Sequence, residues 1–275
     1  MLKRSITAIF IVAAVVGSFL LRQFVDVRLF DILIFAFCAF GSFELLRALN
    51  GRLTVFQKAV VFAFALSVTP VYTFLSISAV FAITVAAVIL LFSSLVFEFE
   101  TTDFTAVGTS LFALCYPSGF LLPLMIINSY EDPKGFVGLL MIIVVSTCAD
   151  TAAYLVGSTV KGPKLCEKIS PKKTISGAIG GVLGGIIGAL GVYFLFGKGV
   201  FINSPLEWIV YVLTGGISSL VTEFGDLVEG AIKRKLDIKD LGNLLPGHGG
   251  MLDRIDGMIF NCVFMFAVFT LVSKF

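Results

Sequence analysis

The sequence has few charged residues and few of the residue types that build sites in soluble proteins. Only 14% of its 275 residues are charged, and it holds one histidine and one tryptophan. Soluble domains carry about 25% charged residues, so a soluble globule is excluded, as are disordered, collagen-like and nucleic-acid-binding chains. Five scattered cysteines, with no CxxC pair or Cys/His cluster, argue against a zinc site or a disulfide framework. The net charge of +2 selects no partner.

Long apolar runs replace the missing charge. Hydrophobic residues make up 58% of the chain, and its mean hydropathy is +1.03. A helix needs about 20 apolar residues to cross a hydrocarbon layer of about 30 Å. The runs between charged residues therefore predict an all-α, polytopic membrane protein with about nine spans. The predicted spans are 5–21, 30–49, 56–72, 76–97, 104–128, 136–156, 175–196, 206–227 and 257–273.

Local features refine these spans. The first run follows Lys3 and Arg4 as in a signal peptide, but no cleavage site leads into a soluble domain, so we expect a retained span. Pro117 and Pro123 predict a kink in the fifth span. The glycine-rich seventh span favours close helix packing, with a ligand groove as the alternative. We expect an N-terminal bundle over 1–128 and a catalytic region over 129–275, with cytosolic loops 157–174 and 228–256.

The distribution of positive charge orients the spans. Five of the 20 Lys and Arg residues fall on one side of this topology, and the other 15 fall on the side of the N-terminus and the loops 157–174 and 228–256. Because the more basic side of a membrane protein faces the cytosol, these loops are predicted to be cytosolic. With nine spans the C-terminus is then outside, which suits a protein of the cell's inner membrane.

Carboxylates gather at the edge of the eighth and ninth spans. Residues 223–256 hold 12 of the 38 charged residues. Glu223, Asp226 and Glu229 are three residues apart and would share one helix face, as would Asp253 and Asp256. Carboxylates at a membrane edge are costly unless they are paired or bind a cation. Pairing with Lys or Arg is one interpretation; the other is a site for Mg²⁺, Mn²⁺ or Ca²⁺, which prefer oxygen ligands.

A glycine-rich loop stands between basic residues and these acids. The run Pro246-Gly-His248-Gly249-Gly250 follows Lys233 and Arg234 and precedes Arg254. Such loops offer backbone N–H groups to phosphates where a helix begins. We expect basic groups to hold phosphate oxygens and acids to hold a metal ion that bridges the two. His248 would donate to a phosphate or hold the loop.

A second basic loop precedes the glycine-rich span. Lys161, Lys164 and Lys168 either set the topology and touch anionic headgroups, or contribute to the phosphate site. Its end combines cations with hydroxyls, and we expect phosphate contacts from Lys172, Lys173 and Thr174. Asp150 is an ionisable group within the sixth predicted span, which makes it a functional candidate. It would serve the metal or substrate, or else pair with a lysine of the next loop.

The pattern of these residues resembles a known family. The run from Gly225-Asp226 through Lys233-Arg234, Lys239-Asp240 and Pro246-Gly-His-Gly-Gly-x-x-Asp253-Arg-x-Asp256 is similar to the signature of CDP-diacylglycerol synthase, also called phosphatidate cytidylyltransferase. Asp150-x-x-Ala-Tyr154-x-x-Gly157 and Ser170-Pro-Lys-Lys-Thr174-x-x-Gly177 resemble its other motifs. The likeness covers most of the C-terminal half.

The resemblance implies a nucleotidyltransferase that joins CTP and phosphatidic acid into CDP-diacylglycerol and pyrophosphate. It implies a homodimer in the bilayer and Mg²⁺, alone or with a second cation, as cofactor. Carried over by position, the metal centre would comprise Asp226, Asp253 and Asp256. The basic positions that match, and that would hold phosphates, are Lys233, Arg234, Lys239 and Arg254.

Two positions depart from the family's pattern. Gly230 stands where the family usually has Ser or Thr, so a hydroxyl near the metal or phosphate is missing. Gly257 stands where many members carry serine after the last aspartate.

Three other functions fit less of the sequence. Asp253-x-x-Asp256-Gly257 resembles the start of the CDP-alcohol phosphotransferase motif, but the continuation lacks its Ala-Arg pair and its further aspartates. The sequence is more similar to a CTP-dependent lipid kinase of the dolichol-kinase type, but the run His248-Gly-Gly-x-x-Asp-Arg-x-Asp256 favours the cytidylyltransferase. An ion-coupled transporter would need polar groups near the midplane and inverted repeats, whereas here the polar groups crowd one membrane face.

Overall fold

The computed structural model describes residues 2–247 and 249–272. Within these residues, nine helical segments are long and apolar enough to cross a membrane, which confirms the all-α fold with nine spans. The α-helices are α1 (Leu2–Phe24), α2 (Phe30–Ala48), α3 (Val55–Phe74), α4 (Ile77–Phe97), α5 (Phe104–Leu114), α6 (Phe120–Asn128), α7 (Lys134–Thr159), α8 (Ile175–Val192), α9 (Glu207–Lys235) and α10 (Leu252–Val272). The segment Phe104–Asn128, which contains α5 and α6, counts as one of the nine. Short helical turns are η1 (Val27–Leu29), η2 (Cys115–Gly119) and η3 (Tyr193–Gly197).

The chain divides into two compact units, and each is described by itself. The first comprises Met1–Met125 with Ile238–Arg254, and the second comprises Ile126–Asp237 with Ile255–Phe275. The divisions fall within α6, after α9 and within α10. The first unit therefore holds the loop before α10, and the second holds the helices that carry most of the acids.

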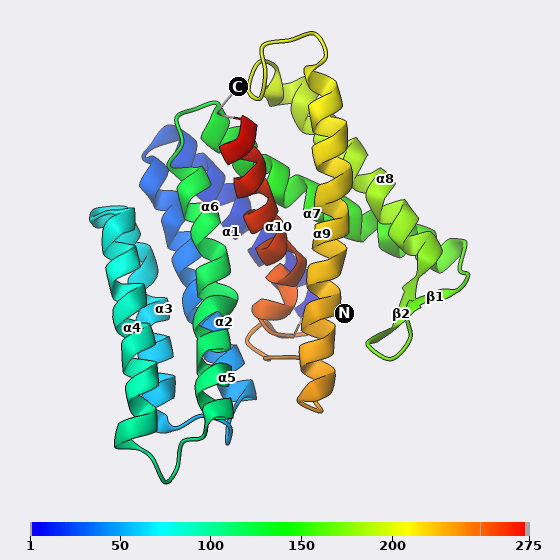
Figure 1. Ribbon diagram of the computed structural model, residues 1–275. Coiled ribbons are helices and arrows are strands. Elements are labelled where there is room, and N and C mark those ends of the chain that lie inside the picture. The colour runs from blue at the N-terminus through cyan, green and yellow to red at the C-terminus, as the bar shows by residue number, and fades with distance from the viewer. Residues whose placement is uncertain (1, 248, 273–275) are drawn as a thin grey trace. The chain divides into compact units, whose positions relative to one another are not determined.

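In the first unit α2 packs on α3, and α3 packs on α4, as Figure 1 shows. Thr54 caps α3: its Oγ1 accepts the N–H of Gln57, whose Oε1 accepts the N–H of Thr54. Nε2 of Gln57 donates to Oγ of Ser94 at 3.0 Å and ties α3 to α4. The kink predicted in the fifth span is confirmed, because Tyr116 has non-helical backbone angles between α5 and α6.

In the second unit α8 packs along α7 and α9 through glycines. A Cβ at Gly184 would lie 2.6 Å from the carbonyl oxygen of Cys148 in α7, and one at Gly185 would lie 3.0 Å from that of Gly215 in α9. Only glycine permits such a close approach of helix backbones. The close packing predicted for this span is confirmed.

The segment 157–174, predicted as a loop, is partly ordered. Helix α7 continues to Thr159, and strands β1 (Lys164–Cys166) and β2 (Ser170–Thr174) then pair antiparallel. Figure 1 shows this hairpin beyond the ends of α7 and α8. Thr174 ends β2 and caps α8, because its Oγ1 accepts the N–H of Gly177 at 3.1 Å.

Helices α9 and α10 extend beyond the apolar runs that predicted them. α9 continues past residue 227 to Lys235, and α10 begins at Leu252 and not at residue 257. Hydropathy marks where a chain enters water, whereas the backbone hydrogen bonds of a helix continue through charged residues. Glu229, in the extension of α9, and Asp253 and Asp256, in the extension of α10, are therefore on helices.

Candidate active site

Two glycines bring α9 and α10 together next to the acids. A Cβ at Gly225 would lie 3.0 Å from both the carbonyl oxygen of Asp256 and the Cα of Gly257. A Cβ at Gly257 would lie 2.7 Å from the carbonyl oxygen of Thr222. The two backbones are therefore in contact where the sequences Gly225-Asp226 and Asp256-Gly257 cross. This crossing places Asp226 and Asp256 near one another.

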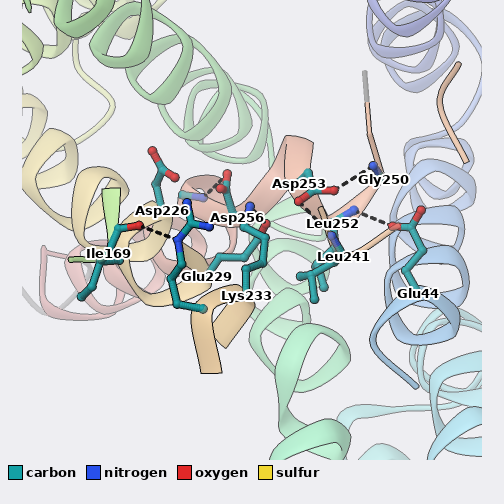
Figure 2. A network of polar contacts seen from close by, with 12 residues as sticks. Glu44, Ile169, Asp226, Glu229, Lys233, Leu241, Gly250, Leu252, Asp253 and Asp256 are labelled. Carbon is teal, nitrogen blue, oxygen red and sulfur yellow. Dashed lines mark hydrogen bonds and ion pairs between the residues drawn. The ribbon is translucent and has the colours of Figure 1, made fainter. Parts of the chain in front are cut away.

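A cluster of charged side chains lies at this crossing. The charges of Glu229 and Asp226 act on Asp256, and so does the charge of Lys233. Figure 2 shows these four side chains close together. Glu229 is fully buried and pairs with Nζ of Lys233 at 2.8 Å, one helical turn away. Nearby, Nε of Arg234 donates to the carbonyl oxygen of Ile169 at 3.2 Å and ties the hairpin turn to α9.

The hairpin supplies a further cation to this cluster. Nζ of Lys173 lies 2.6 Å from Oδ2 of Asp226 and 3.6 Å from Oε1 of Glu223. The predicted phosphate-binding lysine and two predicted acids thus meet in the structure. The structure therefore pairs Asp226, Glu223 and Glu229 with lysines, which was the first of the two interpretations of the carboxylates.

A cavity of about 430 Å³ opens beside this ion pair, between α7, α8, α9 and β2. Small side chains of α7 and α8 form much of its wall. Its charged and polar lining includes Asp150, Lys172, Lys173, Glu223 and Asp226. Thr174 also lines the cavity. The structure thereby brings together the residues predicted from three separate segments of the second unit.

The acids at the α9–α10 crossing suit a hard cation by their chemistry. Asp226 and Asp256 offer carboxylate oxygens, which are the ligands that Mg²⁺ prefers. Within the described residues, no group of three His, Cys, Asp or Glu side chains is gathered tightly enough to hold a metal ion alone. Mg²⁺ is commonly held by one or two carboxylates together with the phosphates of its substrate, so the residues fit a cation that arrives with a nucleotide.

Asp253 belongs to the first unit, where it holds the loop before α10. Its Oδ2 accepts the N–H of Gly250 at 2.8 Å, and its Oδ1 accepts the N–H of Leu241 at 3.3 Å. Gly249 has φ +86°, a conformation that favours glycine. The amide of Gly250, predicted as a phosphate contact, is thus used by Asp253 in this structure.

The remaining predicted residues are placed as follows. Lys239 and Arg254 are exposed in the first unit. His248 lies outside the described residues. The metal-binding and phosphate-binding roles assigned from the sequence remain predictions.

Two polar residues that the sequence reasoning missed hold this part of the fold. Asn261 in α10 is buried, and its Nδ2 donates to Oγ of Ser146 at 3.0 Å and to the carbonyl oxygen of Ile142 at 3.3 Å. Its Oδ1 accepts from Ser218, so it ties α10 to α7 and α9. Glu44 in α2 is the other, with its carboxylate buried against the loop before α10. Both are polar residues within apolar runs, and that signal could have found them.

Comparison with known proteins shows which family the chain belongs to. Residues 2–272 match the profile of the cytidylyltransferase family. The chain is 32% identical to the phosphatidate cytidylyltransferase of Bacillus subtilis over 267 residues, which cover 96% of each protein.

Two further relatives match over a shorter stretch. The phosphatidate cytidylyltransferase of Brucella suis is 40% identical over 47% of this chain and 45% of its own length. That of Mycobacterium tuberculosis H37Rv is 39% identical over 52% of this chain and 40% of its own length. The chain therefore matches less than half the length of these two relatives. With the profile matched from end to end and the full-length likeness to the Bacillus protein, this chain belongs to the cytidylyltransferase family.

Proposed function

We propose that the protein transfers the cytidylyl group of CTP to phosphatidic acid, giving CDP-diacylglycerol and pyrophosphate. Membership of the cytidylyltransferase family supports the reaction class. The similarity to proteins named phosphatidate cytidylyltransferase supports phosphatidate as the acceptor. Nine helices that are apolar enough to cross a membrane, within the described residues, support a lipid substrate.

The cavity beside Lys173 is the observation that carries this proposal. Its volume of about 430 Å³ falls in the range of small-molecule sites, about 300–1,000 Å³. Its lining includes the small residues Ala149, Ala153 and Gly157 of α7, together with Lys172 and Lys173 of β2. A phosphate attached to an apolar tail suits this lining, because the phosphate can meet the cations while the tail lies against small apolar residues.

Lys173 links the acceptor to the acids of the site. In the structure its ammonium group is held at 2.6 Å from Asp226. A phosphate entering the cavity offers Lys173 a second anionic partner, and charge-assisted hydrogen bonds of this kind are about twice as strong as neutral ones. When Lys173 turns to the phosphate, the Asp226 carboxylate becomes available to a cation. Acceptor binding and cation binding are thereby coupled through one ion pair.

The transfer itself needs no strong base. The phosphate of phosphatidic acid is already ionised near neutral pH, and one of its oxygens attacks the α-phosphorus of CTP. A new P–O bond forms, the bond from the α-phosphorus to the bridging oxygen breaks, and the electron pair leaves with pyrophosphate. The chain's lysines and arginines reduce the repulsion between the two anions and hold them in line.

Asp226 and Asp256 would hold Mg²⁺, and the sequence motif alone suggests that Asp253 would be a further ligand. When bound, the ion would neutralise phosphate charge and stabilise the departing pyrophosphate.

The location and assembly are part of the same proposal. The basic side of the chain, with the N-terminus and the hairpin 164–174, faces the cytosol, so CTP arrives from water while acyl chains stay in the lipid of the inner membrane. The protein works as a homodimer. Labelling of a cysteine introduced at Lys164 in inside-out vesicles, and native mass spectrometry in detergent, test these two statements.

Position-specific radiolabel in CTP tests the reaction. Purified protein in detergent is given phosphatidic acid, Mg²⁺ and CTP labelled at either the α- or the γ-phosphate. A cytidylyltransferase transfers the α-label into lipid and releases the γ-label as pyrophosphate. A CTP-dependent lipid kinase would transfer the γ-label into lipid, and that result would overturn the proposal.

A matched pair of lysine variants tests the site. Lys173→Gln should reduce transfer of the α-label, whereas Lys164→Gln, in the other strand of the same hairpin and exposed, should not. Equal effects of the two substitutions would contradict the assignment of the cavity.

A further inference from the structure

Glu44 is a buried carboxylate of the first unit, near the C-terminal end of α2. Only 3% of the Glu44 surface is exposed. A carboxylate within an apolar helix is costly unless hydrogen-bond donors surround it. Its Oε2 accepts the N–H of Leu252 at 3.0 Å, a contact that spans 208 residues of sequence. The amides of Leu244 and Met251 also lie near enough to act on its charge.

The loop before α10 is shaped to admit this carboxylate. A Cβ at Gly242 would collide with Oε1 of Glu44, and one at Gly250 would lie 2.5 Å from Oε2. Both glycines thus have a packing reason to lack a side chain, because Glu44 fills the space that a side chain would need. Figure 2 shows the Glu44 carboxylate directed at the backbone nitrogen of Leu252.

The contact lies at the start of a helix. Leu252 is the first residue of α10, and the first N–H groups of a helix have no partner within it. An anion there is stabilised by the hydrogen bond and by the helix dipole. Glu44 therefore caps α10 from a distant helix.

Asp253 completes the arrangement from within α10. It accepts the amides of Gly250 and Leu241, while Glu44 accepts that of Leu252. Two carboxylates thus bind successive parts of one short loop. If Glu44 were lost, the loop and the first turn of α10 would lose their attachment to α2, and Asp253 would lose its fixed orientation.

We propose that Glu44 is a positioning residue for catalysis: by binding the amide of Leu252, it holds the first turn of α10 and thereby fixes the orientation of the Asp253 carboxylate. The catalytic half of this statement rests on the proposed function; the structural half does not. Glu44 itself touches neither substrate nor reacting atoms.

Glu207 provides a matched control. It is 2% exposed and accepts the amides of Gly199 at 2.6 Å and Phe201 at 2.8 Å, so it is also a buried carboxylate that binds a loop. It lies at the first residue of α9, 19 positions from Asp226, which corresponds to about 28 Å along a helix. Glu207→Gln should cost stability without affecting the acids of α10.

Hydrogen exchange in the absence of substrate tests the attachment. In Glu44→Gln the hydrogen bond to the amide of Leu252 loses its charged acceptor, so exchange in residues 241–252 should accelerate about tenfold or more. In Glu207→Gln the acceleration should appear at residues 199–202 and not at 241–252. Unchanged exchange of residues 241–252 in Glu44→Gln would overturn the proposal, whatever the activity.

The metal dependence of the reaction tests the positioning role. Glu44→Gln should lower kcat and raise the Mg²⁺ concentration for half-maximal rate, by about tenfold each if Asp253 is misplaced. Glu44→Asp retains the charge and should recover part of both, and it replaces Glu44→Gln if that variant fails to fold. A rate that falls only with the amount of folded protein, at an unchanged Mg²⁺ requirement, would show that Glu44 is merely structural. If wild-type protein makes no CDP-diacylglycerol, the proposed function fails while the exchange result still stands.

Discussion

Gly225→Ala is the most direct perturbation of the crossing between α9 and α10. Its added methyl group would lie 3.0 Å from the carbonyl oxygen of Asp256, 3.0 Å from the Cα of Gly257 and 2.7 Å from Cδ2 of Phe260. Two of these three neighbours are backbone atoms, which cannot rotate away as a side chain can. The helices have to move apart, and Asp226 and Asp256 move with them.

The magnitude follows from two opposing contributions. Overpacking of a tight contact costs about 1–3 kcal/mol, and the backbone obstacles put this contact in the upper half of that range. Alanine recovers up to about 1 kcal/mol because it favours a helix more than glycine does. A net loss of about 1–2 kcal/mol in stability is expected. The loss of activity should be larger, because a displacement of about 1 Å in a catalytic arrangement can cost about 100-fold in rate.

The assay compares thermal midpoint and turnover in the same detergent preparation. Gly216→Ala is the matched control in the same helix, because its Cβ would lie 3.6 Å from Ile186, an ordinary contact. This control should be as stable as the wild type or slightly more so, with unchanged turnover. If Gly225→Ala matches Gly216→Ala in both measurements, the crossing does not position the acids and this reasoning is refuted.

Three further substitutions test the site. Asp256→Asn should lower kcat about 100-fold or more at saturating Mg²⁺, because it removes a charge from the proposed cation site, and unchanged turnover in the CTP and phosphatidic acid assay would exclude it. Lys173→Gln should raise the KM for phosphatidic acid about tenfold, since it removes a charge-assisted hydrogen bond, while the KM of Lys164→Gln stays at the wild-type value. Gly230→Ser, whose Cβ has to fit 3.1 Å from Cγ2 of Ile169, should raise turnover by restoring a hydroxyl; turnover equal to the wild type would show that the hydroxyl is unimportant.

Much of the fold could be predicted from the sequence because a membrane imposes one length on every span. The nine apolar runs anticipated the nine candidate spans in the described residues, most within a few positions. The ends of α9 and α10 were harder, because charged residues end an apolar run without ending a helix. The hairpin was missed for a related reason: Lys164–Cys166 and Ser170–Thr174 are short, polar segments with no alternating apolar pattern.

Part of the candidate site was also foreseeable. Lys173 and Asp226 were both predicted, from motifs more than 50 residues apart in sequence, and the structure joins them in one ion pair. The contact of Glu44 with Leu252 could not be predicted, because the two residues are 208 positions apart and Leu252 contributes only a backbone amide, which leaves no trace in a sequence. The criterion that singled out Asp150, an ionisable group within an apolar run, applies equally to Glu44 in the span 30–49 and would have found it.

Gly257 shows how packing and chemistry constrain one another at the crossing. The resemblance places serine at this position in many members of the family, yet here a Cβ would lie 2.6 Å from Cγ2 of Thr222 and 2.7 Å from its carbonyl oxygen. A smaller side chain at position 222 would remove the first obstacle and leave the second, because the second is backbone. A serine at this position of this chain would therefore require α9 and α10 to lie further apart. Gly257 is thus linked to the close approach that brings Asp226 and Asp256 together. The other departure from the family pattern, Gly230, need not have the same cause. Within the described part of the chain, a Cβ at Gly230 would contact only Ile169 of the hairpin turn, and its nearest atom there belongs to a side chain.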